Sequence, residues 1–269
     1  MRGQPDQPDP GLLTGRYARQ IVYRNMGPDA QRKLARSRVV LVGCGAMGGM
    51  QANILVRAGV GWLRIVDPDV AELDNLQRQV LFDEDDVADR AHKAQAARDK
   101  LQGINTDVIV EAEVTRAKPH NIERLIEGAD LMLDGTDDLQ TRYVMNDAAV
   151  KHGLPWVYGG VVADYGSVMS ILPGQTPCLR CLFPDPSDLA EVETCQTVGV
   201  LASAVGVVAS LQAVEAIKIL TGQLEALNRK LVTVDVWAGR LDAVAARRDP
   251  DCPCCGQRRF EFLTRPRAG

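Results

Sequence analysis

Four cysteines in two Cys-x-x-Cys pairs are the residues whose spacing points most directly to chemistry. Cys178 and Cys181 form the first pair, and Cys252 and Cys255 form the second. Two intervening residues let one turn of chain present both sulfurs to one metal, and four thiolates suit tetrahedral Zn²⁺. Four thiolates leave no open position for substrate, so we expect a structural Zn²⁺, with a redox disulfide as the less favoured alternative. Cys254 would change the spacing and is not included.

A glycine-rich turn far upstream indicates a nucleotide site. Gly43, Gly45 and Gly48 match Gly-x-Gly-x-x-Gly between an apolar run and a helical pattern. Residues without side chains let the backbone approach a phosphate, and the N-terminus of a helix favours negative charge. Asp67 ends the next predicted strand, where a carboxylate accepts a hydrogen bond from a ribose hydroxyl. Alone, this pattern is typical of an NAD-dependent oxidoreductase, or of a tight turn that binds no ligand.

Further polar and basic residues favour a triphosphate. Asn75 and Arg78 follow the second predicted strand, Lys93 lies in a later helical segment, and Arg19 precedes the first strand. A dinucleotide oxidoreductase does not need this set. An enzyme that acts on a triphosphate must neutralise the β- and γ-phosphates and the leaving pyrophosphate. Each of these side chains alone would be interpreted as a solvated surface group, but the combination favours triphosphate chemistry.

Two carboxylates follow the fourth predicted strand. Asp137 and Asp138 come directly after Asp134-Gly-Thr. Ligands of open parallel sheets bind at the carboxyl ends of the strands, and a carboxylate there is well placed to hold Mg²⁺ on phosphate oxygens. The alternative role is to cap the following helix. We expect one of the two to cap that helix and Asp137 to contact Mg²⁺.

Alternating apolar and amphipathic segments predict the scaffold for these residues. The expected strands lie at residues 38–43, 62–67, 108–114, 130–134 and 156–158, and the expected helices at residues 46–58, 92–101, 121–127 and 139–152. This alternation is typical of an α/β fold with a Rossmann-like, doubly wound, mostly parallel sheet. Beyond Gly160, the expected strands at 165–172 and 231–237 have no regular helices between them. We therefore expect antiparallel strands to extend the sheet.

Composition agrees with one globular domain. The 269 residues are 46% hydrophobic, and the net charge is −4. We expect a disordered lead-in over residues 1–15 and a single domain over residues 16–269.

The acidic chain has no basic stripe and gives no reason to expect a nucleic-acid partner. Seven cysteines without a secretion signal favour the cytoplasm. The apolar run 198–211 is too short for a membrane span, so we expect a buried helix, under the sheet or at a dimer contact.

Together these segments resemble the ubiquitin-activating-enzyme superfamily, most closely its bacterial sulfur-carrier-activating members of the ThiF/MoeB/HesA type. The resemblance extends over almost everything from Arg16 to Gly256. It is carried by Arg16-Tyr-Ala-Arg19-Gln20, the glycine turn, Asp67 with the run Asn75-Leu-Gln-Arg78-Gln79, Asp134-Gly-Thr-Asp137, the segment from Thr194 to Gly222 and the two cysteine pairs.

The resemblance implies an adenylyltransferase that uses ATP and Mg²⁺. Its substrate would be the C-terminal glycine of a small β-grasp, ubiquitin-like sulfur carrier ending in Gly-Gly. Pyrophosphate would leave, and sulfur would then convert the acyl-adenylate into a thiocarboxylate for thiamine, molybdopterin or related synthesis. No rhodanese-like domain follows the zinc cysteines, which implies a separate sulfur-donor protein. The nucleotide-binding half would span about residues 37–160, and the carrier-binding and zinc half about residues 161–256.

The resemblance also implies a role for each candidate residue. These roles are pocket shaping by Gly43, Gly45 and Gly48, ribose binding by Asp67, phosphate binding by Asn75, Arg78 and Lys93, and Mg²⁺ binding by Asp137. Arg19 would reach into the ATP site of the partner subunit, which implies a homodimer.

Cys195 has two interpretations. In some relatives the matching cysteine links covalently to the carrier, and a thiolate near the adenylate is chemically able to attack it. The alternative is a small residue in a loop. Three alternatives to carrier adenylation also stay open: an NAD-dependent Rossmann oxidoreductase, a non-catalytic partner-binding relative, and a tRNA-modifying relative.

Overall fold

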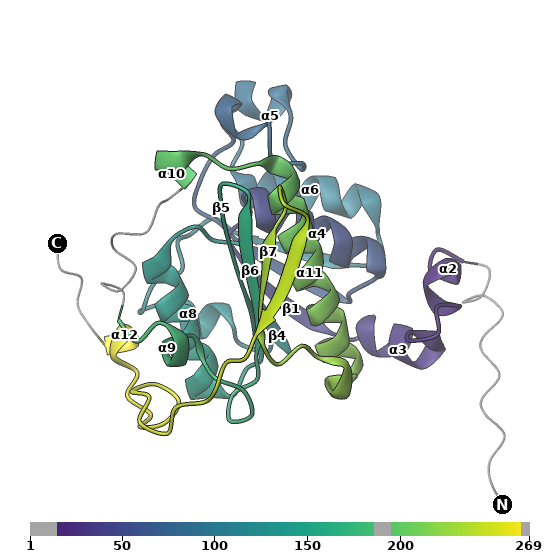
Figure 1. Ribbon diagram of the computed structural model, residues 1–269. Helices are drawn as coiled ribbons and strands as arrows, with labels where there is room; N and C mark the ends of the chain where they lie inside the picture. The colour runs from purple at the N-terminus through teal and green to yellow at the C-terminus, as the bar shows by residue number, and fades with distance from the viewer. Residues whose placement is uncertain (1–14, 186–194, 265–269) are drawn as a thin grey trace, which may run out of the picture.

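One eight-stranded sheet organises the chain (Figure 1). The computed structural model describes residues 15–185 and 195–264, so residues 1–14 of the expected lead-in lie outside the described residues. The strands are β1 (Arg38–Val42), β2 (Trp62–Val66), β3 (Ile109–Glu113), β4 (Leu131–Asp134), β5 (Trp156–Val162), β6 (Tyr165–Ile171), β7 (Leu231–Asp235) and β8 (Arg240–Val244). Their order across the sheet is β3-β2-β1-β4-β5-β6-β7-β8.

The sheet has a parallel and an antiparallel part. Strands β1 to β5 all run parallel to one another. Strands β6, β7 and β8 are each antiparallel to the strand before them. The order 3-2-1-4-5 in the parallel part is that of a doubly wound Rossmann-like sheet, whose direction of winding reverses between β1 and β4. The predicted fold class is therefore confirmed.

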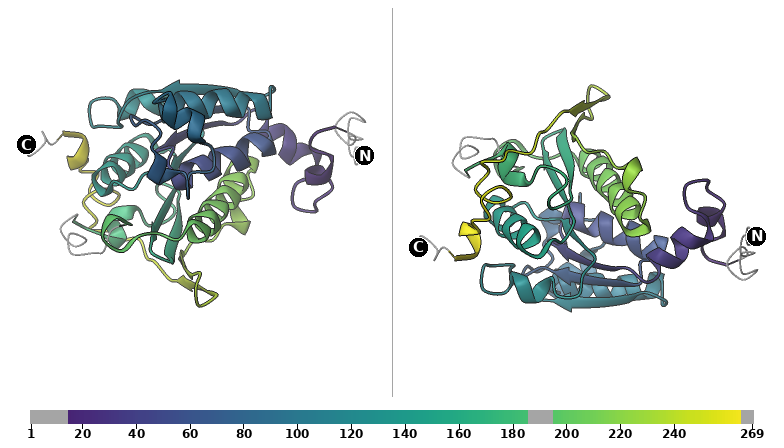
Figure 2. Two further views of the ribbon diagram at one scale, coloured as in Figure 1. Left: turned by 90° about the horizontal axis from the view of Figure 1, so that it is seen from above. Right: turned by 90° about the horizontal axis from the view of Figure 1, so that it is seen from below.

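Helices cover both faces of this sheet. They are α2 (Ala18–Ile21), α3 (Gly27–Leu34), α4 (Ala46–Ala58), η1 (Leu73–Asn75), α5 (Glu84–Ala88), α6 (Lys93–Ile104), α7 (Ile122–Leu125), α8 (Leu139–His152), α9 (Leu179–Leu182), α10 (Cys195–Val198), α11 (Ala202–Thr221), η3 (Leu224–Ala226) and α12 (Glu261–Thr264). Figure 2 shows the sheet between a layer that contains α4 and α11 and a layer that contains α8.

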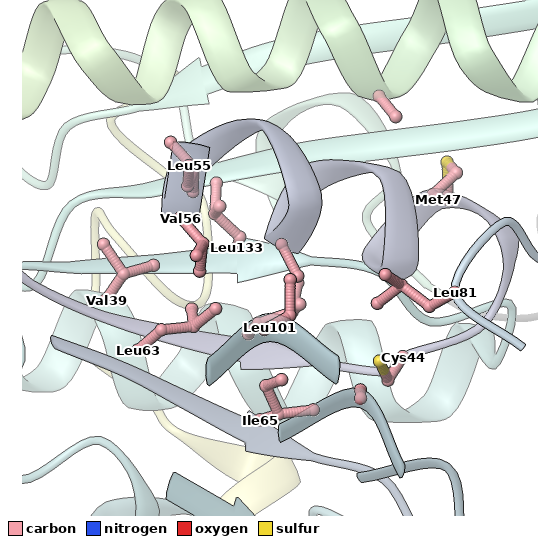
Figure 3. Packing of buried hydrophobic residues seen from close by; sticks show 14 of the residues in the cluster. Val39, Cys44, Met47, Leu55, Val56, Leu63, Ile65, Leu81, Leu101 and Leu133 are labelled. Atoms are coloured by element: carbon pink, nitrogen blue, oxygen red, sulfur yellow. The ribbon is translucent and has the colours of Figure 1, made fainter. Parts of the chain in front are cut away.

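The central strands are apolar on both faces because both faces are covered. In β1, Val39 and Leu41 pack in the cluster that includes α4 and α11, while Val40 and Val42 pack in the cluster that includes α8. Figure 3 shows the first cluster, with Leu55 of α4 close to the side chains of the strands. This near-continuous hydrophobic sequence is what makes buried parallel strands recognisable in the sequence.

Helix α11 is a core helix of this fold. It packs against α4, β5 and β6, and it begins later and ends later than the expected run 198–211. Of the helices that the structure describes, α11 alone has the length and the apolar composition that crossing a membrane requires. However, 56% of its apolar stretch is buried inside the fold. Its buried Gln212 donates hydrogen bonds to the carbonyl oxygens of Asp134 (2.9 Å) and Val157 (3.3 Å). Such polar contacts with the sheet identify α11 as an interior helix.

The strand directions define two edges of the sheet. The edge at which β1, β2, β4 and β5 end is called the carboxyl edge below. Tyr165, at the start of β6, pairs with Asp235, at the end of β7, so the β7–β8 turn lies at the carboxyl edge too. β6 ends at Ile171 opposite Trp156, the first residue of β5, so the chain after β6 leaves from the opposite edge. The cysteine pairs follow β6 and β8 and lie on that opposite side.

Two exposed features differ from expectation. All five residues of β8 are exposed, so the strand has no burial pattern that the sequence could reveal. Trp237 follows β7, where core packing is the usual role of tryptophan, but it is 80% exposed. Trp62 and Trp156, in contrast, are buried in the core.

Candidate nucleotide site and metal centre

The glycine turn connects β1 to α4, and its three glycines differ in what requires them. Gly43 has φ = 89°, and a Cβ there would lie 2.6 Å from the carbonyl carbon of Gly135. A Cβ on Gly48 would clash with the carbonyl oxygen of Gly43. Packing alone therefore explains Gly43 and Gly48. Gly45 has φ = −78°, and the nearest atom to a Cβ there is Nε2 of Gln79 at 3.6 Å, so its missing side chain leaves room for a ligand.

Gly45 is also the N-cap of α4. No side chain caps this end of the helix, so the first backbone N–H groups lack the partner that a capping side chain supplies. A helix N-terminus in this state favours an anion such as a phosphate. The local geometry thus supports the predicted phosphate approach at Gly45.

Asp67 closes β2 beside this turn. Its Oδ2 accepts a hydrogen bond from the backbone N–H of Cys44 (2.6 Å), and its Oδ1 accepts one from the N–H of Asp69 (2.8 Å). Burial raises the pKa of Asp67, and these two hydrogen bonds partly offset the rise. Each carboxylate oxygen can accept a second hydrogen bond, which suits the predicted ribose contact. Cys44 points into the core (Figure 3), where burial raises the pKa of its thiol.

Hydrogen bonds link the side chains of Asp74, Asn75 and Gln79 next to the glycine turn. Nδ2 of Asn75 donates to Oδ1 of Asp74 (2.6 Å), and Nε2 of Gln79 donates to Oδ1 of Asn75 (3.1 Å). This order leaves Oε1 of Gln79 buried without a hydrogen-bond partner among the described residues. An unsatisfied buried acceptor is costly, about 1–3 kcal/mol, so a ligand that donates a hydrogen bond fits here. The sequence assigned no role to Gln79; its signal was the second glutamine of the Asn-Leu-Gln-Arg-Gln run.

Two basic residues lie in the segments that follow β2. Arg78 is half-buried, and its Nη1 donates to the carbonyl oxygen of Asp74 (2.8 Å). Lys93 begins α6 and is only 6% exposed, and its side chain has no hydrogen bond or ion pair to any residue that the structure describes. Its charge acts to lower the pKa values of Asp67 and Cys44, although burial raises both. The backbone N–H of Lys93 donates to the carbonyl oxygen of Asp69 (2.9 Å), which places Lys93 beside the end of β2, with an ammonium group available to an anion.

Asp137 and Asp138 divide their roles as expected for one capping residue and one free carboxylate. Asp138 is the N-cap of α8, and its carboxylate accepts hydrogen bonds from the N–H groups of Gln140 (3.1 Å) and Thr141 (3.3 Å). Asp137 is exposed and forms no hydrogen bond or ion pair with the residues described. A free carboxylate at the carboxyl edge fits a divalent cation held on phosphate oxygens.

Arg19 does not join this group. Its helix, α2, is held at the C-terminal end of α4, where Gln20 donates to the carbonyl oxygen of Ala58 (2.8 Å) and Tyr17 packs on Gly59. The glycine turn is at the N-terminal end of α4, and 13 helical residues span about 20 Å. The exposed Arg19 is therefore far from the glycine turn of its own chain.

The four predicted zinc ligands come together. The Sγ atoms of Cys178 and Cys181 are 3.9 Å apart, those of Cys178 and Cys252 are 3.6 Å apart, and those of Cys181 and Cys255 are 3.4 Å apart. All four lie within 4.8 Å of one another. A tetrahedral Zn²⁺ with bonds of about 2.3 Å places its sulfurs about 3.8 Å apart, so these four thiols fit that ion. Zn²⁺ would hold the segment after β6 to the segment after β8.

The fifth cysteine nearby has another role. The buried Sγ of Cys254 accepts a hydrogen bond from Nδ2 of Asn146 on α8 (3.2 Å). Oδ1 of Asn146 accepts one from the N–H of Leu179 (2.9 Å), next to Cys178. Asn146 thus anchors both cysteine segments to α8, and Cys254 stays outside the group of four, as the spacing predicted. Cys195 begins α10, but its side chain lies outside the part of the chain that the structure describes.

The fold is a Rossmann-like, doubly wound sheet, and a group of four cysteines that could hold a metal ion lies away from its carboxyl edge. The model of the ThiF family matches residues 17–254. The sulfur carrier protein ThiS adenylyltransferase of Bacillus subtilis is 42% identical over 254 residues, which cover 94% of this chain and 74% of that protein. The SAMP-activating enzyme E1 of Haloferax volcanii is 39% identical over 242 residues, with 90% and 88% covered.

A solved structure agrees. Escherichia coli MccB with ATP superposes with a TM-score of 0.79 at 25% identity, over 93% of this chain and 76% of that one. The chain therefore belongs to the ThiF family. The resemblance expected from the sequence is confirmed, as is the prediction of an adenylyltransferase.

Proposed function

We propose that this protein adenylates the C-terminal glycine of a small ubiquitin-like sulfur carrier with ATP and Mg²⁺. The observation that carries the proposal is the grouping of Gly45, Asp67, Lys93 and Asp137 at the carboxyl edge, around the point where the strand order reverses. Open α/β sheets bind ligands at this point. The names of the relatives, which include adenylyltransferases of sulfur carriers, support the choice of substrate.

The reaction needs placement and charge neutralisation more than proton transfer. An oxygen of the carrier's carboxylate, already a nucleophile, forms a bond to the α-phosphorus. The bond from that phosphorus to the oxygen bridging to the β-phosphate breaks, and the electron pair leaves with pyrophosphate. The N–H groups of α4, Lys93 and Arg78 would orient the phosphates, and Asp67 the ribose. Asp137 would hold Mg²⁺, which neutralises charge on the phosphate oxygens when bound.

We also propose a homodimer in which Arg19 serves the partner subunit's site. The distance of Arg19 from its own glycine turn supports this proposal. A second support is a shallow apolar hollow lined by Met50 of α4 and by Gly206, Val207 and Val214 of α11. Val207 and Val214 are 38% and 50% exposed, so α11 would lie under the sheet and also contribute to the dimer contact.

The carrier would dock at the β7–β8 hairpin. Trp237 in its turn is 80% exposed, and Leu241, near the start of β8, is 57% exposed. The turn lies at the carboxyl edge, as does Asp137. Exposed aromatic and aliphatic side chains near a reactive centre are typical of a protein-binding surface. Tryptophan fluorescence would report this contact because Trp62 and Trp156 are buried.

The remaining expectations complete the proposal. The four cysteines would hold a structural Zn²⁺ at the edge of the sheet opposite the nucleotide. A separate protein would donate the sulfur, and the enzyme would act in the cytoplasm as a soluble protein. Cys195 as a covalent acceptor of the carrier stays an alternative to a role without chemistry.

Differential stabilisation by nucleotides tests the proposal against an NAD-dependent oxidoreductase. ATP with Mg²⁺ should raise the melting temperature of the protein, because a ligand that binds only the folded state stabilises it. NAD at the same concentration should raise it much less. A larger shift with NAD than with ATP and Mg²⁺ would refute the proposed function.

A further inference from the structure

A buried arginine lies directly under the loop that carries Asp137. Arg142 is on the first turns of α8, and its side chain is 12% exposed. Its Nε donates to Oδ2 of Asp134 (2.9 Å), and its Nη2 donates to the carbonyl oxygens of Thr136 (2.7 Å) and Gly159 (2.9 Å). One guanidinium group therefore joins the end of β4, the loop after it and the middle of β5.

The partner carboxylate completes this connection. Oδ1 of Asp134 accepts a hydrogen bond from the N–H of Thr136 (3.0 Å), and its Oδ2 accepts one from the N–H of Gly159 (3.3 Å). The pair Arg142–Asp134 thus binds both the N–H and the carbonyl group of Thr136, and both of these groups of Gly159. The peptide between Thr136 and Asp137 is fixed as a result.

Asp137 is fixed from its other side as well. The N–H of Asp138 donates to Oγ1 of Thr136 (3.1 Å), and the carboxylate of Asp138 caps α8. The exposed side chain of Asp137 therefore projects from a backbone that is held before and after it. The arrangement presents a free carboxylate from a fixed backbone, and a metal ligand needs such support.

A gain in stability does not explain why Arg142 and Asp134 form an ion pair inside the fold. The side chain of Asp134 is fully buried, and a buried ion pair is often no more stable than apolar residues of the same volume. Burial lowers the pKa of Arg142, but the attraction of Asp134 more than offsets this, so the pKa is raised and the guanidinium stays charged. The charge of Asp137 also helps to raise the pKa of Arg142.

We propose that Arg142 is a positioning residue that, through Asp134 and Thr136, holds Asp137 where a divalent cation on the nucleotide's phosphates binds. This inference rests on the proposed function. Nε and the two N–H groups of Nη2 are used by Asp134, Thr136 and Gly159, so Arg142 acts on Asp137 through these contacts. Its loss should therefore change the requirement for Mg²⁺ and leave nucleotide binding without metal unaffected.

The chain offers a matched control at another buried arginine. Arg64 on β2 is 15% exposed and pairs with Glu111 (3.1 Å), and it donates to the carbonyl oxygen of Leu125 (2.7 Å). Its guanidinium carbon lies 4.7 Å from the ring centroid of Trp62, as that of Arg142 lies 5.3 Å from the ring centroid of Tyr158. Arg64→Met thus removes a similar set of contacts without altering the loop of Asp137.

The experiment compares Arg142→Met, Arg142→Lys and Arg64→Met with the unmodified protein. For each, the melting shift caused by a fixed concentration of ATP is measured while Mg²⁺ is titrated, without carrier. We expect Arg142→Met to raise the Mg²⁺ concentration for half the shift about tenfold or more, as is usual when a residue that orients a metal ligand is lost. Arg142→Lys keeps the charge but not the fork of donors. It should raise that concentration too and serves if Arg142→Met does not fold.

Arg64→Met should lower the melting temperature and leave the Mg²⁺ requirement unchanged. If the Arg142 variants are destabilised but need no more Mg²⁺ than Arg64→Met, Arg142 is only structural and the inference is overturned. If ATP with Mg²⁺ fails to stabilise the unmodified protein, the proposed function itself fails, which is a distinct result.

Discussion

The backbone of Gly43 lies directly against that of Gly135, so close that a Cβ on Gly43 would be 2.6 Å from the Gly135 carbonyl carbon. These two glycines follow β1 and β4, the neighbouring strands between which the order of the sheet reverses. Their contact joins the glycine turn to the loop that carries Asp137. Phosphates bound at Gly45 would consequently lie near a carboxylate able to hold their Mg²⁺.

The different surroundings of the glycines predict different effects of adding one methyl group. Gly45→Ala should fold with a stability within about 0.5 kcal/mol of the unmodified protein, because only Gln79 lies near a Cβ there. It should lose most of the melting shift caused by ATP and Mg²⁺, since the methyl group occupies the phosphate approach. Gly48→Ala should instead be destabilised by about 1–3 kcal/mol or more through its clash with Gly43. A full ATP shift in Gly45→Ala would contradict this account.

The position of Arg19 predicts that two inactive variants restore activity when mixed. Arg19→Ala and Asp137→Ala should each be inactive alone. In a mixed dimer, the site with an intact Asp137 receives the intact Arg19 of the other subunit, so one of two sites works. After subunit exchange at equal concentrations, pyrophosphate exchange should recover to about a quarter of the unmodified rate. If Arg19 served its own chain, every site would lack one residue and no activity would return.

The raised pKa of Asp67 predicts a pH dependence of nucleotide binding. The carboxylate form accepts the ribose hydrogen bond, which contributes about 1.5–3 kcal/mol. Because burial raises the pKa above its ordinary value of 3.8, this form is lost at a higher pH than usual. As the pH falls from neutrality through the raised pKa, the ATP-induced melting shift should therefore decrease more in the unmodified protein than in Asp67→Asn. A constant difference between the two proteins over this range would rule out Asp67 as the titrating group.

The raised pKa of Asp67 has the opposite effect on the stability of the ligand-free protein, which decreases as the pH rises. A folded state that binds this proton more tightly than the unfolded state gains stability from Asp67 below pH 3.8, and that gain is lost as the pH rises through the raised pKa. Asp67→Asn should remove this dependence. Melting of the ligand-free proteins over the same pH series measures it.

The four-thiol centre predicts one Zn²⁺ per chain and a loss of stability when it is removed. A Zn²⁺ held by the four thiols would join the segments after β6 and β8, and structural zinc contributes many kcal/mol of folding energy. Chelation or Cys178→Ser should lower the melting temperature by about 10 °C or more. Cys254→Ser, outside the group of four, should retain the metal. Metal analysis of both variants checks the assignment, and a Cys178→Ser protein with its full zinc content would disprove it.

The features that the sequence could predict depend mainly on residues that are close together in the sequence. The glycine turn, Asp67 and the cysteine pairs are recognisable because each chemistry needs particular residues a few positions apart. The central strands β1 and β4 are recognisable because burial on both faces makes them largely apolar. The role of Arg142 depends on contacts with Thr136 and Gly159, which reach its guanidinium only in the folded sheet.

Three other features could not be predicted from the sequence because they depend on the folded structure. The side-chain nitrogen of Gln79 donates to Oδ1 of Asn75, and this orientation of the amide leaves the oxygen of Gln79 without a partner among the described residues. Strand β8 has no buried face, so no periodicity marks it. Trp237 is exposed although tryptophan usually packs in the core, because no described element covers the β7–β8 turn.

Exchange of labelled pyrophosphate into ATP tests the central claim most directly. The account predicts that exchange requires a ubiquitin-like sulfur carrier ending in Gly-Gly, and that a carrier without its last glycine does not support it. Arg78→Ala and Asp137→Ala should abolish the exchange, because they remove a phosphate contact and the Mg²⁺ ligand. Exchange that survives both substitutions, or that is equally fast without the carrier, would contradict the account.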